Sequence, residues 1–192
     1  MVEPDFSAIL PVSADFLPRR ADQSSWMGMY LRAGTATDDV RSSAVRSYDV
    51  LAETAASPAV VWRLLLDSRS WPAWSHIDEL DVGRSSGLSS DGRDVVGAIR
   101  AFRVGKTVIT ERVSGLEPGR HFAYEGVESP HMADHQAAID LHETPGGGTR
   151  IRWHGTYRAR GIERWSSGRR VERVMRTMVT GLANHAAGQI GR

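Results

Sequence analysis

The feature that most constrains the fold of this chain is a change of hydrophobic period between its middle and its C-terminal end. From about residue 77 to residue 157, short stretches rich in β-branched and aromatic residues alternate with the turn motifs SSDG, LEPG and PGGG. Such short connections favour antiparallel neighbours. After residue 168 the apolar residues recur every three or four positions, which predicts a long amphipathic helix. A curved antiparallel sheet wrapped around that helix would bury both patterns, and we expect a cavity between them.

The pattern predicts an α+β fold with a seven-stranded sheet. Ser57 followed by Pro58 is typical of a helix start, so a short helix is expected up to residue 66, and a second short helix is expected around Pro72. The long helix spans about residues 171–186, and Gly181 weakens it locally. The strands are expected at residues 45–54, 77–84, 95–103, 106–114, 120–127, 135–143 and 149–157.

The motif SRSWPAWSH, residues 68–76, places Trp71 and Trp74 on either side of a Pro-Ala pair. Both indoles require burial, because a large apolar surface is costly to leave in water. We expect them to plug the end of the core, with Pro72 fixing the backbone that presents them. His76 follows where the chain enters the next strand, and it is expected at the rim of the cavity.

Length and composition indicate one domain. The chain has 192 residues, of which 41% are hydrophobic and 24% charged, close to the globular average. Residues 1–44 show no sustained period, and residues 33–43 are small and polar, so we interpret residues 1–44 as an N-terminal extension, partly ordered or a linker. Residues 45–190 form the predicted ligand-binding domain.

The composition also excludes several classes of function. The chain lacks cysteine, which removes disulfides, thiolate nucleophiles and cysteine-bound zinc. A net charge of +1 provides no general attraction for nucleic acid or membranes. Charges interrupt every apolar run, and the first residues do not resemble a signal peptide, so we expect a cytoplasmic protein without membrane insertion.

No motif in the chain indicates a cofactor or a metal. The chain has no G-x-G-x-x-G or Walker motif. His131 and His135 share the spacing of a helical metal-binding pair, but Pro130 and the strand pattern that follows argue against a helix there. We therefore expect neither a cofactor nor a metal site.

Three segments of the chain are informative together: SPAVVWRLLLDSRSWPAWSH, ITERVSGLEPGRHFAYE and LHETPGGGTRIRWHGTY. With the terminal helix they resemble the SRPBCC or START-like (Bet v 1-like) superfamily, specifically its polyketide cyclase/dehydrase branch, over about residues 45–188. It implies a helix-grip fold, in which the sheet grips the C-terminal helix around a ligand cavity. Members of the superfamily include lipid and hormone binders and polyketide aromatase/cyclases. No catalytic residue carries over by motif.

Strand alternation predicts which polar side chains enter the interior. Tyr124 and His135 share strand faces with apolar neighbours, and Glu111 points inward if its strand buries Ile109 and Val113. The strand at residues 95–103 is ambiguous, and one of its two faces would bring in Arg100. These four polar residues are the candidate catalytic groups, because acid, base and oxyanion-stabilising groups could act together on a ketone or enol. The alternative is that they only pair, pack or orient a ligand.

Three functions follow as hypotheses. The first is binding of a small hydrophobic or aromatic molecule, and the second is a cofactor-independent polyketide cyclase/aromatase or dehydratase. The third is a protein-interaction module that uses residues 26–31 and the arginine-rich start of the last helix. The oligomeric state stays open, and a dimer is compatible with the sequence. The residues expected to contact a ligand are Trp74, Phe122, Tyr124, His135, Ile139, Trp153, Met175, Met178 and Leu182.

Overall fold

The computed structural model describes residues 44–159 and 167–190. The predicted N-terminal extension, with the apolar segment at residues 26–31, lies outside the described residues apart from residue 44. Within the described residues, seven strands form one antiparallel sheet in the order β1-β7-β6-β5-β4-β3-β2. The strands are β1 (Val45–Thr54), β2 (Glu79–Leu80), β3 (Ile99–Val104), β4 (Thr107–Glu117), β5 (His121–Glu128), β6 (Met132–Glu143) and β7 (Thr149–Ala159).

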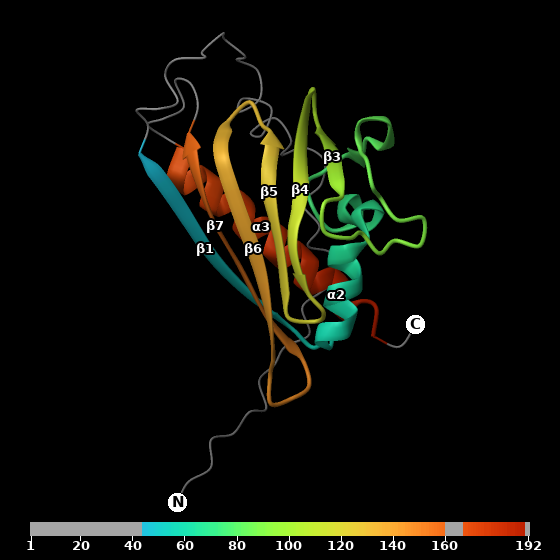
Figure 1. The fold of residues 1–192 in the computed structure, drawn as a ribbon. Helices are drawn as coiled ribbons and strands as arrows, with labels where there is room; N and C mark the ends of the chain where they lie inside the picture. Colours follow the sequence, from blue (N-terminus) through green and yellow to red (C-terminus); the bar gives the residue numbers. More distant parts are fainter. Residues whose placement is uncertain (1–43, 160–166, 191–192) are drawn as a thin grey trace, which may run out of the picture.

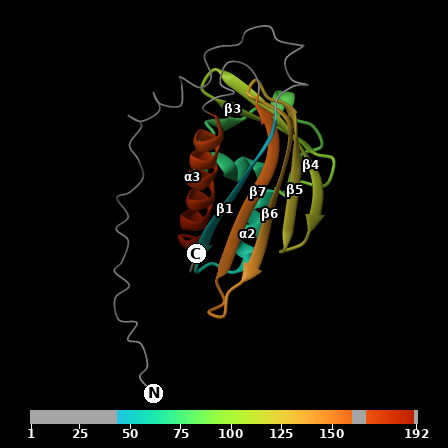
Figure 2. The same cartoon turned by 90° about the vertical axis from the view of Figure 1, so that its left-hand side faces the viewer.

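The helices lie on the inner face of this curved sheet (Figure 1). They are α2 (Pro58–Leu66), the short 3-10 helices η3 (Ser68–Ala73) and η4 (Val82–Arg84), and α3 (Ser167–Ala187). Figure 2 shows the sheet curving around α3, which packs on β1 and β7 and also contacts α2. The predicted α+β arrangement is confirmed, with two short helices after the first strand and a long C-terminal helix. No helix in the described part of the chain is long and apolar enough to cross a membrane.

Local sequence explains the short helices. Ser57 has an extended backbone at the start of α2 and Pro58 occupies the first turn, as predicted, although the Ser57 side chain makes no capping hydrogen bond. Val61 and Leu65, four residues apart, form the buried face of α2. The Asp67 carboxylate accepts a hydrogen bond from the Arg69 amide and so caps η3.

Several strand boundaries differ from the prediction, and three of the differences have a local cause. The segment at residues 77–84 contains only the two-residue β2, because the Asp81 carboxylate accepts a hydrogen bond from the Arg84 amide and starts η4. β3 begins at Ile99 rather than at residue 95, since Gly97 has a φ of 91° and turns the chain. β6 begins at Met132, three residues earlier than predicted, and a bulge near Asp134 accommodates the extra residues.

The tryptophan motif fills one end of the core, as predicted. Trp71 and Trp74 are 1% and 6% exposed, and their ring centroids are 4.8 Å apart. The Trp71 ring stacks on Phe102 at 5.2 Å, and its Nε1 donates to the Leu65 carbonyl. Gly181 of α3 lies directly against the Trp74 carbonyl oxygen, where any side chain would collide with it. A glycine that lowers helix propensity therefore permits close packing of α3 on η3.

Candidate functional site

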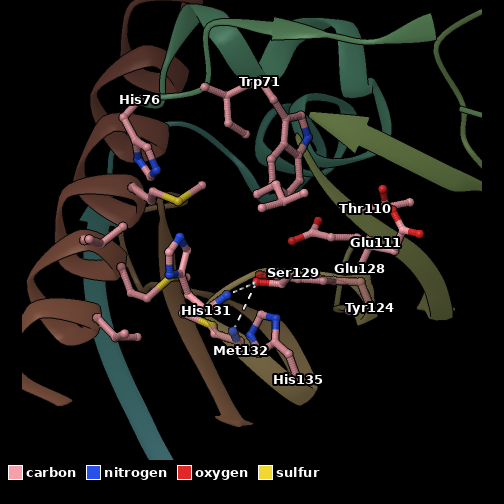
Figure 3. Close-up of a pocket in the computed structure, with 17 residues that line it drawn as sticks. Trp71, His76, Thr110, Glu111, Tyr124, Glu128, Ser129, His131, Met132 and His135 are labelled. Carbon is pink, nitrogen blue, oxygen red and sulfur yellow. Dashed lines mark hydrogen bonds between the residues drawn. The ribbon is translucent and has the colours of Figure 1, made fainter. Parts of the chain in front are cut away.

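A cavity lies between α3, the end of η3 and the part of β4, β5 and β6 that is close to the β5–β6 turn (Figure 3). The centre of a water-sized sphere can occupy about 90 Å³ of it. One buried water needs roughly 10–15 Å³ on this measure, so the space is sufficient for a small molecule. The lining residues are Trp71, His76, Ile77, Ile109, Thr110, Glu111, Tyr124, Gly126, Glu128, Ser129, His131, Met132, His135, Val171, Val174, Met175 and Met178.

The cavity brings together several of the residues singled out from the sequence. Glu111, Tyr124 and His135 come from three adjacent strands (Figure 3). Met175 and Met178 line the same cavity from α3. Assignment of these side chains to ligand binding stays a prediction. The other predicted contact residues are buried in the core outside the cavity lining: Trp74, Phe122, Ile139, Trp153 and Leu182.

The aromatic packing explains why those five residues lie outside the lining. The Trp153 ring contacts Trp71 at 5.9 Å and Trp74 at 6.5 Å between centroids. Trp71 also faces Phe122, at 6.4 Å. These rings fill the interior next to η3, so the cavity occupies the end near the β5–β6 turn. Strand alternation indicated which side chains point inward, but it did not indicate which part of the interior they fill.

Arg100 and Glu111 form a buried ion pair beside the cavity. The ambiguous strand turns Arg100 inward, and its side chain is fully buried. Its Nη2 lies 3.3 Å from Glu111 Oε2, whereas Nε and Nη1 have no hydrogen-bond partner among the described residues. The guanidinium carbon lies 4.3 Å from the Trp71 ring and 4.9 Å from the Phe122 ring. Arg100 therefore supports the cavity wall from behind, held by one carboxylate and by aromatic faces.

Burial controls the charge of Glu111. It raises the pKa of Glu111 to about 7, against the opposing effect of the Arg100 charge and hydrogen bond. Burial likewise lowers the pKa of Arg100, and the neighbouring Glu111 raises it; an arginine nevertheless stays protonated in a protein. Near neutral pH, Glu111 is therefore present in both the protonated and the ionised form, and it can exchange a proton within the cavity.

His135 is held by a residue that the sequence reasoning missed. Its Nε2 lies 2.9 Å from the hydroxyl oxygen of Tyr48, on β1. Burial lowers the pKa of His135 to about 4, so the imidazole is neutral at pH 7. The available signal for Tyr48 was its position two residues before Val50, on the buried face of β1.

Two further histidines line the cavity. His76 was predicted at the rim, and the structure places it in the lining with its Nδ1 buried. Burial lowers the pKa of His76 to about 4, although the charge of Asp78 raises it. His131 precedes β6, and His135 lies within it, so the helical geometry of a metal-binding pair is absent, as predicted. No three His, Asp or Glu side chains within residues 44–159 and 167–190 are placed to hold a metal ion.

The arginine-rich start of α3 is an exposed surface. Arg169, Arg170 and Arg173 are exposed, and Arg176 pairs with Glu172 at 2.7 Å. Such a distribution is typical of a solvated helix face. Two further arginines that precede this helix, at positions 160 and 164, lie outside the described residues.

A family model described as "Polyketide cyclase / dehydrase and lipid transport" matches residues 46–187. The chain belongs to this family. The predicted membership of the SRPBCC superfamily, in its polyketide cyclase/dehydrase branch, is thereby confirmed. No protein of curated function matches the chain significantly.

Several solved structures share the fold of this polyketide cyclase/dehydrase family member. The Zhui aromatase/cyclase from Streptomyces sp. R1128 is 15% identical, with a TM-score of 0.62 over 77% of this chain and 96% of its own. XoxI from Bacillus cereus is 18% identical, with a TM-score of 0.59 over 73% of this chain and 94% of its own. Aha1 from Colwellia psychrerythraea, solved as a dimer, is 15% identical, with a TM-score of 0.55 over 76% and 98%.

At these identities the likeness shows the fold alone, and it confirms the predicted helix-grip arrangement. Membership of the family supports a ligand-binding or cyclase role in general. The particular function has to be argued from the cavity.

Proposed function

We propose that this protein binds a small, mostly apolar or aromatic molecule in the cavity between the sheet and α3. The observation that carries the proposal is the cavity itself, with apolar walls from α3 and Ile109 and a few polar groups that converge on it. Tyr124, His135 and Glu111 are the groups expected to orient the ligand. Interior polar groups are costly to bury, so their position at a cavity supports a role in recognition.

The volume limits the size of the ligand. An engineered cavity of roughly 150 Å³ accepts benzene, so a space of about 90 Å³ accepts, without rearrangement, a molecule smaller than one aromatic ring. A larger ligand requires the wall to move. Met175 and Met178 are the side chains suited to this, because a methionine adapts its three rotatable bonds to the shape of a neighbour.

A second candidate function is cofactor-independent cyclisation or dehydration. The observation that favours it is the pairing of Glu111, whose pKa is raised to about 7, with the neutral His135 in the lining of one cavity. The pKa of Glu111 lies above the ordinary value of a glutamate, and the pKa of His135 lies below the ordinary value of a histidine. Two groups whose pKa values are shifted in this way can act as acid and base on an enolisable ketone. The third hypothesis, an interaction module, predicted a filled interior, and the cavity does not favour it.

Native mass spectrometry of the gently purified chain, followed by titration with single-ring aromatic compounds, tests the binding proposal. We expect either a retained small molecule or saturable binding that perturbs the NMR signals of Met175 and Met178. The variant Val174→Phe should fill the cavity and abolish binding. Thr180→Phe, on the exposed face of the same helix, is the matched control. Absence of any retained or titratable ligand in the wild-type protein would contradict the proposal.

Glu111→Gln separates binding from catalysis. The amide keeps the shape of the carboxyl group but cannot exchange a proton, so an enzyme should lose turnover of a bound ketone while it retains affinity. If the wild-type protein releases every bound compound chemically unchanged, the catalytic alternative fails and the binding proposal stands.

A further inference from the structure

The contact between Tyr48 and His135 joins two strands that are not neighbours in the sheet. Tyr48 lies on β1 and His135 on β6, with β7 between them in the sheet. The Tyr48 ring passes over Gly155 of β7, where a Cβ atom would lie 2.6 Å from the Tyr48 hydroxyl oxygen. On the other side, a Cβ atom at Gly126 of β5 would lie 3.1 Å from His135 Cβ. The two neighbouring strands therefore carry glycine where this pair needs room.

The hydrogen bond between Tyr48 and His135 has a direction. Burial raises the pKa of Tyr48, so its hydroxyl group stays protonated. The buried Tyr48 keeps its own proton and needs an acceptor for it. His135 Nε2, at 2.9 Å, is that acceptor.

If Nε2 of His135 accepts, the single proton of the neutral ring resides on Nδ1. Nδ1 has no hydrogen-bond partner among residues 44–159 and 167–190. It lies toward Gly126, which also lines the cavity. Nδ1 is not one of the fully buried atoms that lack a partner, so a ligand in the cavity can reach it and accept its hydrogen bond.

We propose that Tyr48 is a positioning residue that holds His135 with its proton on Nδ1, so that the cavity offers an N–H donor to a carbonyl oxygen of the ligand. This inference rests on the proposed binding function and narrows its ligand class to small apolar molecules that carry a hydrogen-bond acceptor. Tyr48 acts through His135 and does not itself line the cavity.

The first test needs no ligand. In the full chain labelled with ¹⁵N-histidine, the side-chain ¹⁵N shifts of His135 should show a protonated Nδ1 and an unprotonated Nε2. In Tyr48→Phe the proton should shift largely to Nε2. Tyr157→Phe removes another buried hydroxyl, on a ring whose centroid lies 6.4 Å from that of Tyr48, and should leave the His135 shifts unchanged. A wild-type His135 protonated on Nε2 overturns the inference, and so does a folded Tyr48→Phe variant with unchanged His135 shifts.

The second test compares acetophenone with ethylbenzene, which are similar in size and differ by one carbonyl oxygen. Wild-type protein should bind acetophenone roughly 2- to 12-fold more tightly, the range expected for one hydrogen bond. In Tyr48→Phe this ratio should fall towards one. Equal affinities in the wild type overturn the inference although the binding proposal stands. If neither compound binds, the binding proposal fails for ligands of this size, and the ¹⁵N shifts still decide whether Tyr48 positions His135.

Discussion

Replacement of Glu111 by glutamine should make the protein more stable at high pH, even though it removes the partner of Arg100. A pKa raised from 4.5 to about 7 means that the folded protein resists ionisation of this carboxyl group, whereas the unfolded chain does not. The folded state therefore binds more protons than the unfolded state between these two values. The contribution of Glu111 to stability accordingly falls as the pH rises from about 4.5 to about 7.

The size of the effect follows from the two pKa values. Their difference corresponds to roughly 3 kcal/mol at pH 8, and to under about 1 kcal/mol at pH 5. At pH 5 the folded protein already holds a protonated Glu111, which an amide imitates closely. Glu111→Gln should thus change little at pH 5 and gain roughly 3 kcal/mol over the wild type at pH 8.

Urea unfolding followed by tryptophan fluorescence measures this difference, because unfolding exposes the buried Trp71 and Trp153. Each variant is compared with the wild type at the same pH, so that the other titrating groups cancel. Glu117→Gln changes an exposed glutamate of the same strand and should stay within about 0.5 kcal/mol at both pH values. If Glu111→Gln is less stable than the wild type at pH 8, attraction to Arg100 outweighs burial and the reasoning is refuted.

Three further perturbations have defined outcomes. Gly181→Ala should destabilise the protein by about 1–3 kcal/mol in thermal unfolding, because the added carbon collides with the Trp74 carbonyl, whereas helix propensity alone predicts a gain. The pKa of His135 is lowered from 6.5 to about 4, so its contribution to stability is present above pH 6.5 and is lost as the pH falls towards 4. The wild-type protein should therefore lose roughly 3 kcal/mol of unfolding free energy from this group across that range. In His135→Gln this loss should be absent when the unfolding free energy is measured with urea. Arg100→Met should raise the pKa of Glu111 further, measured by ¹³C NMR of the carboxyl group, since the Arg100 charge opposes that rise; an unchanged value would show that the pair is not coupled.

Sequence reasoning placed the polar groups of the interior correctly where a strand alternates cleanly. Tyr124 and His135 were assigned to the inner face from their apolar neighbours, and both line the cavity. The strand that carries Arg100 could not be assigned, because both of its faces contain apolar residues. The turn at Gly97 shortens this strand, and the side chain of Arg100 enters the core between aromatic rings.

The relation of Tyr48 to His135 could not be predicted from the sequence. The two residues are 87 positions apart, and their contact depends on β1 pairing with β7 rather than with the strand that follows it. Sequence periods report which face of an element is apolar, but they do not report which elements become neighbours. Gly155 leaves room for the Tyr48 ring, but the reason for a glycine at this position is apparent only once the strands are assembled.

The amino-acid sequence by itself determined the classes and order of the elements, the inward faces of most strands and the family. These properties depend on local period, turn chemistry and short motifs, which are present in the linear chain. The tertiary structure alone decided the position of the cavity and the charge of its groups. Aromatic packing around Trp71 confines the cavity to one end of the interior, and burial sets the pKa values of Glu111 and His135. Packing and desolvation depend on all neighbours in space at once, so no local pattern encodes them.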